Sequence, residues 1–317
     1  MHVLVLSGGL SAERDVSLRS GRRVAEALRT DRSDWEVQES DVDSTLLDRL
    51  RAHRPDAIVP LLHGAAGEDG ALRNVLESLR IPYVGSSAAA SRLAFDKPIA
   101  KTLADGAGLD TPPCVAMPQS TFRELGATGV LDAVIDAVGL PLVVKPTKGG
   151  SSLGTAIVHR AADLPAAMVG AFAYGDVVLM ERYVGGTEVS IGVFERGGDV
   201  LALSAVEIVP EGELYDYAAR YTAGTTEFFC PARLDDERAL AAQAMALNMH
   251  VLLGLQDWSR TDLIIDPDGR PWFLEVNVAP GMTETSLFPQ ALVAADIGLG
   301  EITADLVEAA ITRAALV

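Results

Sequence analysis

The side chains best suited to chemistry lie in residues 259–277, SRTDLIIDPDGRPWFLEVN, where two strand-like runs flank Asp268 and Gly269. An Asp-Gly pair between two apolar runs predicts a β-hairpin with a type I′ turn. With these residues as the turn, Asp262 lies directly opposite Glu275 on the neighbouring strand. Because facing carboxylates repel each other, this register predicts a cation between them.

Two interpretations of this acidic pair stay open on spacing alone. The same register sets Arg260 opposite Asn277, so that all four polar side chains share one face. Two carboxylates and an amide oxygen are hard ligands that suit Mg²⁺, with phosphate oxygens and water at its remaining positions. Alternatively, Arg260 neutralises both acids on a solvated sheet face, as charged pairs often do on exposed strands.

A glycine-rich loop, KPTKGGSSLG at 145–154, follows an apolar strand-like run. Backbone amides of such a loop can line an anion, and Lys145 at its edge supplies positive charge. The loop lacks the GK[ST] ending of a P-loop, and a strand rather than a helix is expected after it, which disfavours a P-loop NTPase. A glycine-rich hairpin turn is the alternative.

Two further loops stand where open α/β sheets bind ligands. Residues 7–17, SGGLSAERDVS, open a helix whose first amides could hold a carboxylate, although Glu13 in a first turn usually complements the helix dipole. His63 begins HGAAGEDG at the end of a strand and is otherwise an ordinary loop residue. A phosphate loop, a lysine, an acidic hairpin and two strand-end loops together indicate nucleotide-dependent chemistry.

Three units are expected to position these residues in a mixed α/β (α+β) fold. Residues 1–95 alternate apolar runs (HVLVLS, DAIVPLL, IPYVG) with helical stretches, which predicts an open parallel sheet. Residues 96–186 suggest a smaller α+β domain, and 187–317 a third domain with long strands. The irregular stretch at 210–231 is too long for a passive connection, so it is expected to be a functional loop.

A well-specified helix is predicted at 235–253, with Asp235 as its N-cap and Gly254 just after its end. Its periodic apolar positions are expected to face the core. These positions are Leu240, Ala244, Leu247 and Val251.

Composition excludes several classes of protein. The 317 residues are 49% hydrophobic and carry a formal charge of −18, which disfavours binding to nucleic acid or an anionic membrane surface. The absence of an 18-residue apolar run or a basic leader predicts a cytoplasmic protein. Cys114 and Cys230 are far apart and lack metal-ligand spacing, so both are expected to be free thiols.

The order of these motifs resembles that of the D-alanine-D-alanine ligase family over nearly the full chain, and such an ordered set is highly specific. The segments that carry the resemblance are GGLSAERDVSLRSG, HGAAGEDG, FDKPIAK, KPTKGGSSLG, YDYAARY, RTD, EVN and PGMTETS.

The resemblance implies a three-domain ATP-grasp fold with ATP between the central and C-terminal domains. It also implies two Mg²⁺ ions, with Mn²⁺ as a substitute, on Asp262, Glu275 and Asn277, the set that the hairpin register indicates. The resemblance also implies a set of ATP-binding residues. The phosphates would contact Lys97, Lys145 and Ser152, the adenine would contact Glu181, Arg182, Tyr183 and Val184, and the ribose would contact Glu188.

The implied reaction joins two D-alanines for peptidoglycan synthesis through an acyl phosphate. Arg260 and the Gly281 amide would stabilise the tetrahedral oxyanion, while Glu13 and His63 would hold the first ammonium group. Other residues would close the tyrosine-bearing loop (residues 210–231, called the tyrosine loop) over the site or bind the carboxylate of the second D-alanine. The closing set is Ser151, Tyr221 and Glu13, and the carboxylate set is Arg220, Ser286 and Leu287.

Alternatives follow from departures near the second-substrate pocket, where Arg220 replaces a common lysine. One is a paralogous ATP-grasp ligase that joins other amino or hydroxy acids, and another is a non-catalytic nucleotide-binding module. Tyr221 favours a dipeptide-forming ligase over depsipeptide-forming relatives. The resemblance implies a homodimer.

Overall fold

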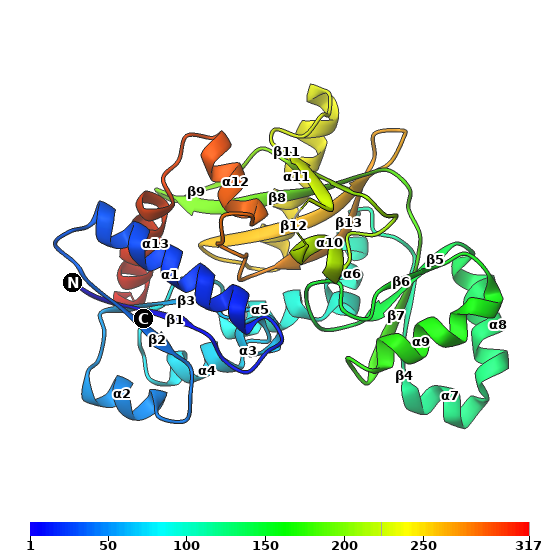
Figure 1. Ribbon diagram of the computed structural model, residues 1–317, viewed down its shortest axis with the longest axis horizontal. Helices are drawn as coiled ribbons and strands as arrows, with labels where there is room; N and C mark the ends of the chain where they lie inside the picture. Colours follow the sequence, from blue (N-terminus) through cyan, green and yellow to red (C-terminus); the bar gives the residue numbers. More distant parts are fainter. Residues whose placement is uncertain (223, 317) are drawn as a thin grey trace.

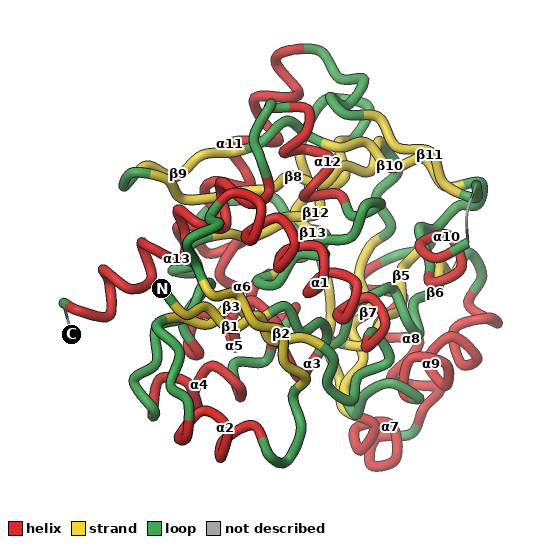
Figure 2. Tube along the Cα trace, turned by 60° about the vertical axis from the view of Figure 1, so that its left-hand side comes forward, coloured by secondary structure: helices red, strands yellow, loops and turns green. Residues whose placement is uncertain are grey.

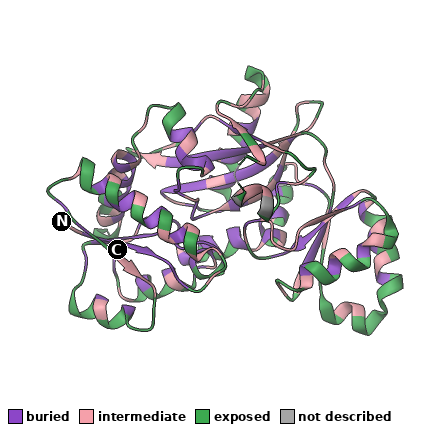
Figure 3. Ribbon diagram, in the orientation of Figure 1, coloured by how far each residue is buried: buried purple, intermediate pink, exposed green. Residues whose placement is uncertain are grey.

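The computed structural model describes residues 1–222 and 224–316, apart from the side chains of residues 218 and 221, as a mixed α/β protein with three sheets. In Figure 1 the N-terminal sheet lies at the left, the sheet of β4 to β7 at the right, and the largest sheet between and above them. Figure 2 shows the helices wrapped around these strands. The strands are mostly buried, whereas the outer faces of α2, α7 and α8 are exposed (Figure 3).

The N-terminal sheet has the parallel order β2-β1-β3, which confirms the predicted parallel sheet. Its strands are β1 (His2–Ser7), β2 (Glu36–Asp41) and β3 (Ala57–Pro60). Its helices are α1 (Arg14–Asp31), α2 (Leu46–Ala52), α3 (Ala65–Glu68) and α4 (Ala71–Ser78). The strand expected at IPYVG is wrong, because this segment makes only an isolated bridge between Ile58 and Tyr83.

Helices also cover a four-stranded antiparallel sheet of order β4-β7-β5-β6. The strands are β4 (Cys114–Pro118), β5 (Leu142–Pro146), β6 (Ala156–Val158) and β7 (Val177–Arg182). The helices are α7 (Gln119–Leu125), α8 (Ala127–Val138), the short 3₁₀ helix η1 (Ala161–Asp163) and α9 (Leu164–Phe172). Apolar side chains of α8 and α9 pack on this sheet in one core.

The largest sheet is antiparallel, with the order β11-β10-β8-β12-β13 and with β9 also paired to β8. Its strands are β8 (Thr187–Arg196), β9 (Asp199–Ala202), β10 (Val206–Pro210), β11 (Thr226–Phe229), β12 (Trp258–Ile265) and β13 (Pro271–Asn277). Between β10 and β11 lies the short helix α10 (Tyr217–Tyr221), so the segment expected to be irregular contains regular structure.

Helices cover both faces of this sheet. One face packs against α5 (Ala88–Phe95), α6 (Lys97–Gly106) and α11 (Asp236–Leu252). The other face packs against α12 (Leu287–Ala294). The sheet therefore separates two cores. The face toward α12 also carries polar side chains within the strands, among them Ser190 and Asp262, which lie directly opposite each other.

Helix α11 confirms the predicted caps but not the predicted face. Asp235 accepts a hydrogen bond from the Arg238 amide, and Gly254 follows the helix with φ 64°. Of the four expected core positions only Leu247 packs against the core; Ala244 is exposed, Leu240 is 65% exposed and Val251 66% exposed. The buried residues are Ala242, Met245, Ala246, Met249 and His250. Small residues on this face let the helix approach the sheet closely, so both sides of α11 carry apolar residues.

The last helix, α13 (Leu299–Ala315), packs against the first, α1, in a shared core. The crossing is close, because a Cβ on Gly300 would lie 2.4 Å from the Ala27 carbonyl oxygen. Helices α5 and α6 likewise pack on the largest sheet. Packing therefore crosses the expected divisions at 95/96 and 186/187, and those domain boundaries stay predictions.

Candidate active site

The hairpin of β12 and β13 has the predicted register at its polar end but a different turn. Asp262 pairs with Glu275 and Arg260 with Asn277. The type I′ turn is wrong: the Asp266 amide bonds to the Arg270 carbonyl, which leaves three residues in the loop, and Gly269 takes φ 88°. This matches a type I turn followed by a left-handed glycine. A bulge between Asp262 and Leu263 then restores the predicted pairs.

Two different cations neutralise the facing carboxylates. Arg260 binds Asp262 through two hydrogen bonds of 2.8 and 2.9 Å, and Lys97 Nζ lies 3.2 Å from a Glu275 oxygen. Burial opposes ionisation of Glu275, but nearby cations led by Lys97 outweigh it and lower its pKa to about 2. The alternative in which Arg260 alone neutralises both acids therefore does not describe this arrangement.

The amide of Asn277 and the hydroxyl of Ser190 complete the surroundings of Asp262. Asn277 Nδ2 donates to Asp262 at 3.3 Å, and Ser190 Oγ donates at 2.7 Å. Within the part of the chain that the structure describes, no cluster of three or more His, Cys, Asp or Glu side chains is arranged to hold a metal ion. The expected ligand set is thus brought together, with Arg260 in contact with one of its carboxylates.

A cavity of about 500 Å³ lies between the four-stranded sheet and the largest sheet, within the range typical of small-molecule sites. All the residues expected to bind ATP line it. They are Lys97, Lys145, Ser152, Glu181, Arg182, Tyr183, Val184 and Glu188. These residues come from α6, β5, the glycine-rich loop, and the segment from the end of β7 to the start of β8, so four separate parts of the chain converge on one space.

Glu181, at the back of this cavity, is buried between two lysines. Its oxygens lie 2.5 Å from Lys145 Nζ and 2.8 Å from Lys101 Nζ. Burial opposes its ionisation, yet the two lysines outweigh burial and lower the pKa of Glu181. Sequence reasoning missed Lys101, although it lies one helical turn after Lys97 in the same FDKPIAK segment.

Glu188 also lines this cavity. The pKa of Glu188 is raised to about 7, mainly by burial and in smaller part by the carboxylates of Asp262 and Glu275, while Arg220 and Lys145 oppose the rise. These surroundings favour either a proton on the Glu188 carboxyl or a cation bound next to it.

A second cavity of about 100 Å³ adjoins the first and is lined by nearly all the residues expected to bind substrate. These are Glu13, His63, Ser151, Arg220, Arg260, Gly281, Ser286 and Leu287. Ser151 Oγ donates a hydrogen bond to Glu13, and an Arg220 nitrogen lies 3.2 Å from Ser152 Oγ. The side chain of Tyr221 lies outside the described residues.

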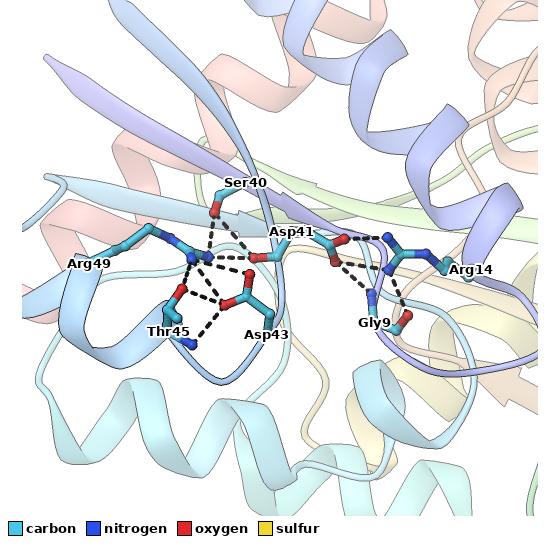
Figure 4. Close-up of polar contacts among 7 residues, drawn as sticks. All are labelled: Gly9, Arg14, Ser40, Asp41, Asp43, Thr45 and Arg49. Carbon is cyan, nitrogen blue, oxygen red and sulfur yellow. Dashed lines mark hydrogen bonds and ion pairs between the residues drawn. The ribbon is translucent and has the colours of Figure 1, made fainter.

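Hydrogen bonds and ion pairs fix the loop that leads into α1, next to Glu13; Figure 4 shows those made by Arg14 and Asp41. Arg14 bonds both the Gly9 carbonyl, at 2.8 Å, and the Asp41 carboxylate at the end of β2. The hydrogen bond from Arg14 is the main reason that the pKa of Asp41 falls to about 2. A Cβ on Gly8 would lie 2.2 Å from an Asp41 oxygen, so this loop requires glycine there. Arg49 bonds Ser40 and Asp43 in the same cluster.

His63 and Glu68 come from the same loop and helix but differ in their surroundings. His63 Nδ1 lies 3.1 Å from the Ala279 oxygen, and its Nε2 lies 3.1 Å from Ser20 Oγ. Glu68, which sequence reasoning did not assign, accepts a hydrogen bond from the Gly64 amide at 2.7 Å and lines the second cavity. Burial, with a contribution from Glu13, raises the pKa of Glu68 to about 8. Its place inside HGAAGEDG was the available signal.

Ser286 stabilises the loop after β13. Its Oγ accepts a hydrogen bond from the Thr283 amide at 3.0 Å, and a Cβ on Gly281 would lie 2.8 Å from the same oxygen. The close approach explains why a glycine stands at 281. Cys114 and Cys230 are free thiols, as predicted, and no helix of residues 1–222 and 224–316 combines the length and apolarity needed to cross a membrane.

Comparison with known proteins gives a consistent relationship. Residues 103–308 match the family model described as D-ala D-ala ligase C-terminus. The chain is 45% identical over 297 residues to D-alanine-D-alanine ligase of Anaeromyxobacter dehalogenans (strain 2CP-C), which covers 94% of this chain and 92% of that protein. It is 42% identical over 305 residues to the enzyme of the same name from Nitrosospira multiformis, covering 95% and 94%.

Solved structures agree. D-alanine-D-alanine ligase from Bacillus anthracis superposes with a TM-score of 0.83 at 30% identity, covering 100% of this chain and 99% of that one. Its complex with ATP gives 0.82 at 26% identity, covering 100% and 99%. VanG D-Ala:D-Ser ligase from Enterococcus faecalis gives 0.83 at 26% identity, covering 98% and 99%. The chain therefore belongs to the D-alanine-D-alanine ligase family of ATP-dependent ligases and has the ATP-grasp fold of that family.

Proposed function

We propose that this protein uses ATP to join two D-alanine molecules into D-alanyl-D-alanine for peptidoglycan synthesis. The observation that supports this most is the junction of the two cavities, which share Gly150, Tyr215, Arg220 and Glu275. A nucleotide in the larger cavity and amino acids in the smaller one would meet at this junction. Family membership supports the choice of ATP and D-alanine.

In the larger cavity, Lys97 and Lys145 would hold the phosphates, with Ser152 at the glycine-rich loop. Glu181 and the segment 182–184 would meet the adenine, and Glu188 the ribose hydroxyls. The support is the position of these residues around one cavity. Lys145 forms an ion pair with Glu181, which holds its ammonium group in the cavity before ATP binds. The phosphates would then share this lysine with Glu181.

Magnesium fits the hairpin on the chemistry of the donors. Asp262 and Glu275 face each other, and the amide of Asn277 is adjacent to Asp262. Asn277 would turn its amide to present oxygen, and Asp262 would keep one oxygen for Arg260. Bound Mg²⁺, or Mn²⁺ in its place, would neutralise the phosphate charge of ATP.

The first step would form a bond between a carboxylate oxygen of the first D-alanine and the γ-phosphorus of ATP, while the bond from that phosphorus to the β-bridging oxygen breaks. Glu13 would hold the ammonium group of this substrate, since its carboxylate lines the smaller cavity beside Ser151. ADP and an acyl phosphate result. Lys97 and Lys145 would stabilise the charge that spreads over the transferred phosphoryl group.

In the second step the amine of the second D-alanine, having lost a proton, would attack the acyl carbon and release phosphate. Arg260 and the Gly281 amide would stabilise the oxyanion of the tetrahedral intermediate. Arg220, Ser286 and Leu287 would receive the second carboxylate, and all three line the smaller cavity.

The loop that contains α10 would cover the junction and exclude water from the acyl phosphate. Ser151 and Glu13 already share a hydrogen bond, and Tyr221 would join them. We assign the substrate loops to residues 1–95 and the ATP cavity to 96–186 and 187–317. The family resemblance alone supports a cytoplasmic location and a homodimer.

The test is phosphate release from Mg-ATP with D-alanine, L-alanine, D-serine and D-lactate, added singly and in pairs, with product masses recorded. Release with D-alanine alone, together with the mass of D-alanyl-D-alanine, is expected. Release only with another pair would keep the ATP chemistry and overturn the assignment of D-alanine as both substrates.

A further inference from the structure

Ser20 connects two segments of the smaller cavity that are far apart in the sequence. It lies on α1 and is fully buried. Its Oγ accepts a hydrogen bond from the Met282 amide at 3.1 Å and lies 3.1 Å from Nε2 of His63. One hydroxyl therefore joins the loop after β3 to the loop after β13.

The partners of His63 fix the positions of its protons. The Ala279 carbonyl oxygen, 3.1 Å from Nδ1, can only accept, so Nδ1 carries a hydrogen. Burial is the main cause that lowers the pKa of His63, and Arg260 lowers it further against Glu13 and the Ala279 bond. The ring is therefore neutral, and its Nε2 offers a lone pair. Ser20 can then donate to Nε2 while it accepts from Met282, which satisfies every polar group in the chain of contacts.

This arrangement leaves His63 with neither a charge nor an unengaged nitrogen for the substrate. The resemblance had suggested that His63 holds the first ammonium group, which would need a lone pair that Ser20 already uses. Glu13 remains as the group that can bind the ammonium. A buried neutral histidine with both nitrogens bonded to protein is better suited to holding structure than to binding a cation.

Arg23, a second residue of α1, also binds the loop after β13. Arg23 donates to the Met282 carbonyl at 3.1 Å and to the Thr283 carbonyl at 2.7 Å. The segment 279–283 is thus held at the Ala279 carbonyl, the Met282 amide and two further carbonyls. Gly281, whose amide is proposed to face the oxyanion, lies inside this segment.

We propose that Ser20 is a positioning residue that, through His63 and the Met282 amide, fixes the segment 279–282 and so places the Gly281 amide for the tetrahedral intermediate. This inference rests on the proposed function, in which that amide stabilises the oxyanion. Oxyanion donors act through geometry set before the reaction, so a small displacement of the segment reduces the rate of the chemical step.

Ser20→Ala is expected to lower kcat by about 10- to 100-fold with little change in the KM for ATP, since the loss of one oxyanion donor sets the upper end of this range. Ser20→Cys, which keeps a weaker donor, should fall between the wild type and the alanine variant, and it serves if Ser20→Ala does not fold. His63→Gln should reduce kcat as well. If both residues act through one chain of contacts, the double variant loses no more than the worse single variant.

The matched control is Ser91→Ala. Ser91 is a fully buried helix serine on α5 whose hydroxyl bonds the Ser86 carbonyl, outside both cavities. This variant should keep the kcat of the wild type. An equal loss of kcat in Ser91→Ala would show that deletion of any buried hydroxyl has this effect and would overturn the proposal.

The state of the ring is measured directly by ¹⁵N NMR of the five histidines, with the His63 signals assigned as those missing in His63→Gln. A hydrogen on Nδ1 and a bare Nε2 are expected between pH 6 and 8, with the Nε2 signal shifted in Ser20→Ala. A hydrogen on Nε2, or independent losses of kcat in Ser20→Ala and His63→Gln, overturns the proposed positioning role of Ser20. These spectra need no substrate, so failure to make D-alanyl-D-alanine would sink the proposed function and leave the test of Ser20 intact.

Discussion

Asp262 and Glu275 face each other across β12 and β13, yet each is paired with its own cation, Arg260 in one case and Lys97 in the other. The two cations come from different elements, a strand of the largest sheet and the first turn of α6. Each carboxylate is therefore neutralised locally, and a shift of α6 changes the charge around Glu275 without affecting the Arg260 pair.

Removing either carboxylate charge is expected to abolish the reaction. Asp262→Asn and Glu275→Gln keep the shape of the side chain but remove the charge required for the metal, so phosphate release should fall by at least about 100-fold. Thermal unfolding should stay cooperative with a lower midpoint, because a buried cation loses its partner. Asp268→Asn, in the turn of the same hairpin, is the control. Normal activity in both active-site variants would rule out the metal assignment.

The buried pair of Lys101 and Glu181 is expected to matter for stability. Lys101→Met leaves Glu181 with only Lys145, and the free energy of unfolding should fall by about 2 to 4 kcal/mol, somewhat below the cost of a fully unpaired buried charge. Urea unfolding measures it. Lys148→Met removes an exposed lysine paired with Asp96 and should cost less than about 1 kcal/mol. Equal losses in the two variants would contradict the assignment.

The raised pKa of Glu68 predicts how stability changes with pH. Its carboxyl has a pKa of about 8 in the folded protein and an ordinary value of 4.5 when unfolded. Below pH 4.5 both states are protonated. Between pH 4.5 and 8 the folded state binds the extra proton, so stability falls as pH rises, by up to about 5 kcal/mol.

Glu68→Gln removes this titration, so the variant should lose less stability than the wild type between pH 5 and 8. Urea unfolding at a series of pH values provides the comparison, with Glu124→Gln on the exposed surface of α7 as the control. Parallel pH curves for the wild type and Glu68→Gln would show that the carboxyl titrates near its ordinary value.

Loss of the hydrogen bond between Ser151 and Glu13 is expected to weaken binding of the first substrate. Ser151→Ala removes a hydrogen bond that orients the Glu13 carboxylate, so the KM for D-alanine at the first site should rise by roughly 10- to 150-fold, the equivalent of a hydrogen bond to a charged group. Steady-state kinetics at saturating ATP measures the change. Ser120→Ala on the exposed surface of α7 should leave the KM unaltered. A change confined to kcat would place Ser151 elsewhere in the reaction.

Closure of the tyrosine loop is expected to protect the acyl phosphate. Tyr221→Phe should raise the ratio of ATP hydrolysed to dipeptide formed, because water then reaches the intermediate more often. Phosphate and dipeptide are measured in the same reaction. An unaltered ratio would remove this role from the hydroxyl.

The sequence predicted the hairpin register correctly although it predicted the wrong turn. A two-residue turn without a bulge and a three-residue turn with a bulge set the same residues opposite each other at the polar end. The alternation of polar residues on one face constrained the register more strongly than the turn chemistry did. The face of α11 was less predictable, because Leu240 and Val251 follow a helical period as well as the buried residues do.

The spacing of residues in the sequence could not predict which side chains matter because of partners far away in the chain. Lys101 gains its role from Glu181, and Ser20 from His63 and Met282. These contacts span long stretches of chain and depend on how helices seat against sheets. A sequence motif identifies the loop that reaches the site. It does not identify the side chains that hold the site in place from the helices, such as Ser20 of α1 and Lys101 of α6.

The packing of α13 on α1 has a consequence for the order in which the chain acquires its structure. Val24 and Leu28 of α1 are covered in the same core as Ile302 and Leu306 of α13. During synthesis the first helix emerges long before the last, so the N-terminal sheet can cover only part of its apolar face until α13 has been made. The N-terminal sheet is thus among the first parts synthesised and among the last to be fully covered.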